Sequence, residues 1–135
     1  MQPDQGSSDV RMGEIGLEKT EAGVAVLSIS GEHDLSTAPE LRTQLERLSD
    51  SGTPVVVDLS AATFVDSSIL GVILEARRRA VEGGLGFAVA QTNGSAAVTR
   101  VLQITGLQGE LPVHESREEA LADAGSGTGA EQASS

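Results

Sequence analysis

Short apolar runs alternate along the chain with longer stretches in which apolar residues recur every three or four positions. The apolar runs predict buried strands at residues 23–30, 54–60 and 85–91, with shorter strands near 14–18 and 110–114. The periodic stretches predict helices at residues 36–52, 68–84, 96–107 and 116–124. Because each helix then crosses from one strand to the next, the order predicts an α/β domain with a largely parallel sheet.

Capping boxes and glycines set the predicted ends of the helices. Thr37 with Glu40, and Ser116 with Glu119, have the spacing of a capping box, in which a hydroxyl accepts from a free backbone amide. The glycines at 52, 83 and 84 end the first two helices. Within the first predicted helix, at 36–52, the spacing of Leu41, Leu45 and Leu48 places these three residues on one buried face.

Both ends of the chain lack this periodicity. Residues 1–12 and 125–135 are rich in Gly, Ser, Gln and Ala, which predicts disordered tails. Residues 13–124 then form one domain, in agreement with a length of 135 residues and a hydrophobic fraction of 39%. A domain of this size buries roughly two-thirds of its unfolded surface, so it needs no metal or disulfide to hold its core.

Composition excludes several functions. The absence of cysteine rules out disulfides, thiol catalysis and cysteine-ligated zinc. A formal net charge of −11 and only two aromatic residues argue against nucleic acid as a partner. The N-terminus carries no apolar signal region and no window is apolar enough to cross a membrane, so we expect a soluble cytoplasmic protein without direct membrane insertion.

The stretch "TFVDSSILGVIL", residues 63–74, places Asp66, Ser67 and Ser68 directly before an apolar helical run. Asp and Ser are preferred N-cap residues, so helix capping is one interpretation. One cap satisfies only one or two free amides, and three polar residues stand in a row. A serine hydroxyl is then left near the positive end of the helix, where a phosphate group is favoured. A phosphorylation site is therefore the second interpretation, and both stay open at this point.

Three segments together resemble a known family. "GEHDLSTAPEL" at 31–41, "VVVDLS" at 55–60 and "FVDSSILGVIL" at 64–74 resemble, in order and spacing, the STAS domain of bacterial anti-sigma factor antagonists. The similarity covers roughly residues 13 to 124. It implies a single STAS-like α/β domain with a mixed, mostly parallel four- to five-stranded sheet and interleaved helices.

The resemblance also implies partner switching in the bacterial regulation of transcription. Similar proteins are not enzymes and use no cofactor or metal; unphosphorylated, they bind an anti-sigma factor and thereby release a sigma factor. That anti-sigma factor is a serine kinase, which inactivates its antagonist by phosphorylating the first serine after the motif aspartate. This position is Ser67 here, although the residues alone do not distinguish it from Ser68. A metal-dependent serine phosphatase would reset the switch.

Four further residues complete the expected partner-binding surface around Ser67. By resemblance, Asp66 shapes the phosphorylation loop and Asp34 contributes from a neighbouring loop. Ile69 stands where many family members have Gly. If the helix packs on the sheet through its other apolar residues, Ile69 and Val72 remain outside as an apolar partner patch. Coverage of both residues by another segment is an equal alternative on pattern alone.

Two rival functions are compatible with the same residues. The chain could be a STAS regulatory subunit of another system, such as a stressosome component or a lipid-transport ATPase subunit, that is not controlled by phosphorylation. It could instead be a serine hydrolase that pairs Ser67 with His33 or His114, but Ser67 is not in a G-x-S-x-G elbow. We expect His33 to be a surface residue. The two histidines are too far apart in sequence to suggest a metal site.

Overall fold

The computed structural model describes residues 13–92, 96–106 and 111–126. The predicted tail at 1–12 and most of the one at 125–135 lie outside these ranges. The elements, in chain order, are β1 (Glu14–Lys19), β2 (Ala25–His33), α1 (Ala38–Asp50), β3 (Val55–Asp58), β4 (Ala62–Val65), α2 (Ser67–Glu82), β5 (Phe87–Ala90), α3 (Ala96–Thr105), β6 (Val113–His114) and α4 (Arg117–Gly125). The last helix therefore continues one residue into the range predicted as the C-terminal tail.

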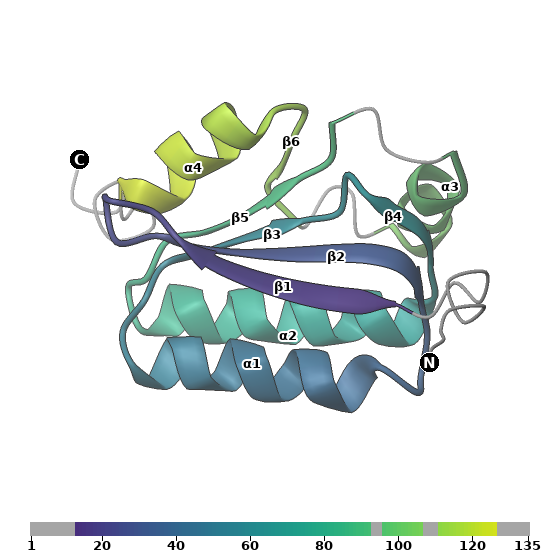
Figure 1. Cartoon of the computed structure of the whole chain (residues 1–135), viewed down its shortest axis with the longest axis horizontal. Helices are drawn as coiled ribbons and strands as arrows, with labels where there is room; N and C mark the ends of the chain where they lie inside the picture. Colours follow the sequence, from purple (N-terminus) through teal and green to yellow (C-terminus); the bar gives the residue numbers. More distant parts are fainter. Residues whose placement is uncertain (1–12, 93–95, 107–110, 127–135) are drawn as a thin grey trace, which may run out of the picture.

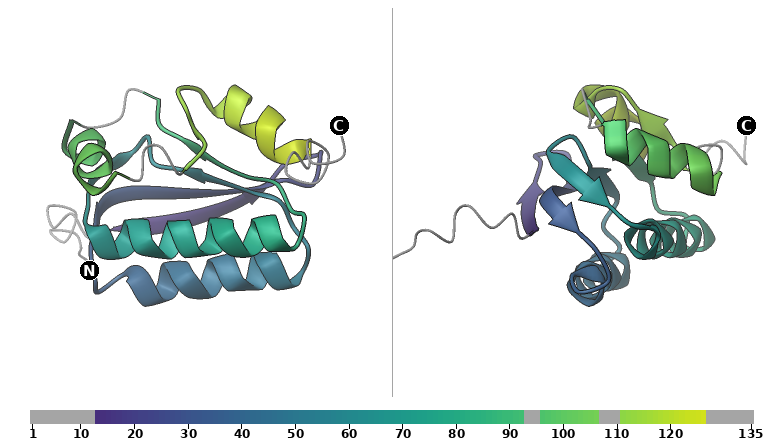
Figure 2. Two further views of the ribbon diagram at one scale, coloured as in Figure 1. Left: turned by 180° about the vertical axis from the view of Figure 1, so that it is seen from behind. Right: turned by 90° about the vertical axis from the view of Figure 1, so that its right-hand side faces the viewer.

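A single sheet of six strands forms the middle of the molecule (Figure 1). Its strand order is β1-β2-β3-β5-β6, and β4 pairs with β2 beside β3. Only β1 runs antiparallel to its neighbour, whereas the other pairs are parallel. Helices α1 and α2 lie side by side on one face of the sheet and α4 covers the other face (Figure 2). The predicted mixed, mostly parallel α/β architecture is confirmed, with one strand more than expected.

The additional strand is β4, which the apolar pattern did not reveal. β2 continues to His33, three residues beyond the predicted end, and β4 pairs with this extension. A change of register between Gly31 and Glu32 separates the part of β2 that pairs with β3 from the part that pairs with β4. As a consequence β2 and β4 end side by side, with His33 opposite Val65.

The core has two layers of unequal size. Between the sheet and α1 and α2 lie most of the buried large apolar side chains, including the three predicted leucines at 41, 45 and 48. The layer under α4 consists mainly of small residues: Val24, Val26, Val56, Ala88, Ala90, Ala120 and Ala124. Small side chains allow a close approach, and a Cβ atom on Gly86 would overlap the backbone of Ala124.

The two predicted capping boxes behave differently. The hydroxyl of Ser116 accepts from the amide of Glu119 at 3.0 Å, which confirms its role at the start of α4. Thr37 precedes α1, but its hydroxyl makes no capping hydrogen bond to that helix. The hydroxyl instead contacts His33 and the backbone of Asp34. The capping box predicted at Thr37 was therefore wrong, because a partner from β2 engages the hydroxyl.

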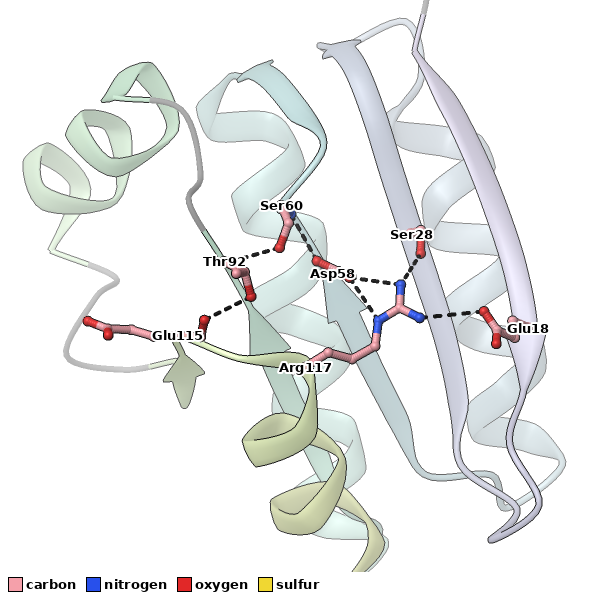
Figure 3. A network of polar contacts seen from close by, with 7 residues as sticks. All are labelled: Glu18, Ser28, Asp58, Ser60, Thr92, Glu115 and Arg117. Atoms are coloured by element: carbon pink, nitrogen blue, oxygen red, sulfur yellow. Dashed lines mark hydrogen bonds and ion pairs between the residues drawn. The ribbon is translucent and has the colours of Figure 1, made fainter.

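An ion pair holds α4 to the centre of the sheet (Figure 3). Arg117 donates from Nε and Nη2 to Oδ2 of Asp58, at 3.1 and 2.9 Å. The other oxygen of Asp58 accepts from the amide of Ser60 at 2.9 Å. Burial alone would raise the pKa of Asp58, but the hydrogen bonds from Ser60 and Arg117 outweigh it and lower the pKa. Asp58 is thus a nearly buried carboxylate that stays charged at neutral pH.

Candidate functional site

The predicted site lies at the edge where β2 and β4 end together. Asp34 follows β2 directly and Asp66 follows β4 directly. Because the two strands are parallel neighbours, both acids are brought to the same edge of the sheet. The amide of Asp66 donates to the carbonyl of His33 at 3.3 Å, which joins the two strand ends. The structure therefore brings together Asp34 and the "DSS" motif, which are 32 residues apart in sequence.

Asp66 is the N-cap of α2. Its Oδ1 accepts from the amide of Ser68 at 3.0 Å and from the amide of Ile69 at 3.2 Å. The hydroxyl of Ser68 donates to the same oxygen at 2.5 Å. The capping interpretation is therefore correct for Asp66, whose carboxylate also accepts a hydrogen bond from the hydroxyl of Ser68.

Ser67 is the first residue of α2 and its side chain is exposed. Among the described residues, none forms a hydrogen bond with its hydroxyl, whereas Ser68 is held by Asp66. The start of a helix carries partial positive charge from its free amides, which favours a negatively charged group at that end. The two adjacent serines therefore differ in their surroundings, a difference that the sequence alone does not contain.

The turn after β2 presents Asp34 to solvent. Its Oδ1 accepts from the hydroxyl and the amide of Ser36, at 2.6 and 2.9 Å. These hydrogen bonds lower the pKa of Asp34, and the neighbouring His33 lowers it further. Asp34 is consequently a charged, ordered carboxylate at neutral pH.

The predicted apolar patch on α2 is wrong. Ile69 is 0% exposed and Val72 is 3% exposed. Helix α1 packs along α2, and Leu45 of α1 lies beside Val72. The equal alternative, coverage by another segment, is therefore correct. Being buried, Ile69 adds no apolar surface beside Ser67.

Two other apolar side chains are exposed near this edge. Leu35, next to Asp34, is 72% exposed, and Phe64 on β4 is 40% exposed. Sequence reasoning missed both as surface residues. Leu35 stands alone in a polar turn, which is a sequence signal for exposure. Phe64 could be placed only once β4 was known to pair with the end of β2, a tertiary contact that the sequence pattern does not show.

Both histidines are engaged away from Ser67. His33 is fully buried rather than on the surface as expected, and its ring contacts Thr37 and two backbone carbonyls. His114 bonds to Asp123 at 2.8 Å. In the part of the chain that the structure describes, no hydrogen bond or ion pair joins a histidine to Ser67, so the geometry offers no support for the hydrolase alternative. Within the same ranges no group of three His, Asp or Glu side chains is placed to hold a metal ion.

Comparison with known proteins agrees with this arrangement. The family model described as the STAS domain matches residues 18–120. An anti-sigma F factor antagonist of Paenibacillus polymyxa is 31% identical over 103 residues, which are 75% of this chain and 86% of that protein. A STAS-domain containing protein of Pseudomonas aeruginosa is 30% identical over 92 residues, which are 68% of this chain and 89% of that protein.

A solved structure extends the likeness to three dimensions. The crystal structure of an anti-sigma factor antagonist from Mycobacterium paratuberculosis matches with a TM-score of 0.71 and 29% identity, over 84% of this chain and 94% of that one. Among the described residues, no helix is long and apolar enough to span a bilayer. Since the family model covers most of the chain and the fold agrees, the chain belongs to the STAS domain family.

Proposed function

We propose that this protein is an anti-sigma factor antagonist that is switched off by phosphorylation of Ser67. Its partner would be an anti-sigma factor with serine kinase activity, whose binding releases a sigma factor. The observation that carries the proposal is the exposed hydroxyl of Ser67 at the start of α2, beside a serine that Asp66 already engages. The names of the relatives from Paenibacillus polymyxa and Mycobacterium paratuberculosis support the same function.

The geometry favours Ser67 over Ser68 as the phosphate acceptor. Phosphorylation of Ser68 would break its hydrogen bond to Asp66 and place a phosphate beside that carboxylate. Ser67 has no such hydrogen bond to lose within the described residues. A negative group at the start of a helix is favoured by about 0.3 to 1 kcal/mol.

The surroundings of Ser67 suggest how phosphorylation would release a partner. Asp34 and Asp66 make this edge acidic, while Leu35 and Phe64 supply exposed apolar surface. A kinase-type anti-sigma factor that docks here needs basic and apolar groups in matching places. A phosphate adds roughly 1.5 to 2 negative charges and a shell of water to an apolar contact, which disfavours that complex. A metal-dependent serine phosphatase would restore the binding form.

Complex formation tests the proposal directly. The purified chain is titrated with the kinase-type anti-sigma factors of its host, without ATP, and binding is measured by calorimetry. We expect wild type and Ser68→Ala to bind alike, and Ser67→Glu to bind at least about tenfold more weakly because of its charge. Failure of wild type to bind any of these kinases would refute the proposal. Co-purification with a membrane transporter would then favour a regulatory subunit of a lipid-transport ATPase.

A further inference from the structure

Gly71 is an exposed glycine in the interior of helix α2, where a glycine weakens the helix. Glycine loses more conformational entropy on folding than any other residue, and it is less favourable than alanine at such a position. An added Cβ atom at Gly71 would meet no atom within 4 Å, and the φ angle of this residue is not positive. The fold itself therefore gives no reason for a glycine here.

The other glycines of the described chain have a structural reason, with one exception. At every other described glycine except Gly16, either φ is positive or an added Cβ atom would meet an atom of the chain within 4 Å. Gly86, for example, lies against the backbone of Ala124. Gly16 is also exposed and unobstructed, but it lies on the edge strand β1. Among the residues that the structure describes, Gly71 is thus the one helical glycine that neither a turn nor a contact explains.

Gly71 lies on the same face of α2 as Ser67. The two residues are four positions apart, and residues with this spacing on a helix have Cβ positions about 5 to 6 Å from each other. Both are exposed, whereas Leu70 and Val72 on either side of Gly71 are buried. In the left-hand view of Figure 2, no other element of the described chain crosses in front of α2. The helix face that begins at Ser67 therefore continues as uncovered backbone at Gly71.

We propose that Gly71 is a specificity-determining residue at which the kinase-type anti-sigma factor packs against the backbone of α2, an inference that rests on the proposed function of Ser67. An enzyme that phosphorylates Ser67 must bring the γ-phosphate of ATP into line with that hydroxyl, so its surface must extend over the adjacent helical turn. The absence of a side chain at Gly71 allows a close approach of the partner's main chain. The stability that the glycine sacrifices is then offset by its fit to the partner.

The neighbours of Gly71 indicate what kind of surface fits it. One turn further along α2, Glu75 pairs with Arg42 of α1 and with Arg79. The charge of Glu75 is therefore already matched, and Gly71 itself carries none. A main-chain segment with small, uncharged side chains fits between Ser67 and this paired group. Any side chain added at Gly71 would occupy the space that such a segment needs.

Two substitutions separate this role from a role in folding. Gly71→Ala adds one methyl group and Gly71→Gln adds a longer side chain, and both have a higher helix propensity than glycine. Gly16→Ala and Gly16→Gln are matched controls at the other unobstructed glycine. Urea unfolding measures stability. Calorimetry without ATP measures binding to the kinase-type anti-sigma factors of the host.

We expect Gly71→Ala to be more stable than wild type, with a urea midpoint higher by about 0.3 to 0.5 M. We expect it to bind at least about fivefold more weakly, and Gly71→Gln at least about fiftyfold more weakly, because each fills the contact space. Both Gly16 variants should bind like wild type. A variant that is more stable and yet binds less well cannot owe its weaker binding to a damaged fold.

Three results would overturn the inference, and the first two leave the proposed function intact. One is equal binding by wild type and Gly71→Ala. Another is a lower urea midpoint in Gly71→Ala, since the glycine would then serve the fold. Failure of the wild type itself to bind any of these kinases is the third result, and it refutes the proposed function together with this inference.

Discussion

The hydroxyl of Ser68 donates to Oδ1 of Asp66 at 2.5 Å, while the adjacent hydroxyl of Ser67 is exposed to solvent. The same oxygen of Asp66 accepts from the amides of Ser68 and Ile69. One carboxylate therefore fixes the start of α2 and engages one of two neighbouring serines. The capping and phosphorylation interpretations of "DSS" are compatible, because the cap determines which hydroxyl points outward.

The capping role of Asp66 predicts a stability change. Asp66→Ala removes the acceptor of two backbone amides, so we expect the free energy of unfolding to fall by about 1 kcal/mol. Asp66→Asn keeps an oxygen in the same place and should cost much less. Urea unfolding at neutral pH measures both. Equal losses in the two variants would mean that the negative charge, rather than the cap, is what stabilises the helix.

Near Ser67, substitution of a buried apolar residue should lower stability, whereas substitution of an exposed one should weaken partner binding. Ile69→Ala opens a cavity in the core and should lower the free energy of unfolding by about 2 to 4 kcal/mol. Leu35→Ala, at an exposed position, should change it by less than about 0.5 kcal/mol but weaken the complex with the anti-sigma factor. Urea unfolding and calorimetry give the two quantities. A loss of less than about 1 kcal/mol in Ile69→Ala would contradict the tight packing of this side chain, and unchanged binding by Leu35→Ala would contradict a place for Leu35 in the complex.

Most of the fold could be predicted because its elements carry strong local patterns. The buried strands β3 and β5 are runs of apolar residues, and α2 has helical length with glycines at its end. β4 has no such pattern, since two of its four side chains are exposed and its pairing with the end of β2 is a tertiary contact. A helical period likewise shows that α2 is apolar over much of its circumference, but not that α1 covers Val72.

The sequence predicted which loops carry the site residues better than it predicted the burial and contacts of the side chains around them. The order of motifs placed Asp34 and Asp66 in neighbouring loops, as the structure also does. The sequence did not reveal the burial of His33, because a histidine between Glu32 and Asp34 has polar neighbours in the chain. Only the folded chain brings Thr37 and the carbonyls of β1 and β2 to its ring.

The ion pair between Arg117 and Asp58 predicts a pH-dependent contribution to stability. Because the pKa of Asp58 is lowered in the folded state, the contribution is present above the unfolded pKa of about 4 and is lost as the pH falls below it. Arg117 is 42% exposed at its side chain, so we expect Arg117→Gln to cost only about 1 to 2 kcal/mol at pH 7.

The matched control for this prediction is Arg42→Gln, which breaks an exposed pair with Glu75 at 3.5 Å. It should change the free energy of unfolding by less than about 0.5 kcal/mol. Urea unfolding is measured at about pH 7 and about pH 3, the second of which lies below the pKa of about 4 that an aspartate has in the unfolded chain. If the difference between wild type and Arg117→Gln did not shrink at the lower pH, another contact of Arg117 would be responsible.

The most direct test of the central claim is mass spectrometry of the chain after incubation with ATP and the kinase-type anti-sigma factors of its host. Wild type, Ser67→Ala and Ser68→Ala are compared by intact mass and by peptide mapping. We predict a single phosphate on wild type and on Ser68→Ala, and none on Ser67→Ala. A phosphate that persists in Ser67→Ala, or no phosphate on wild type with any of these kinases, would contradict the account.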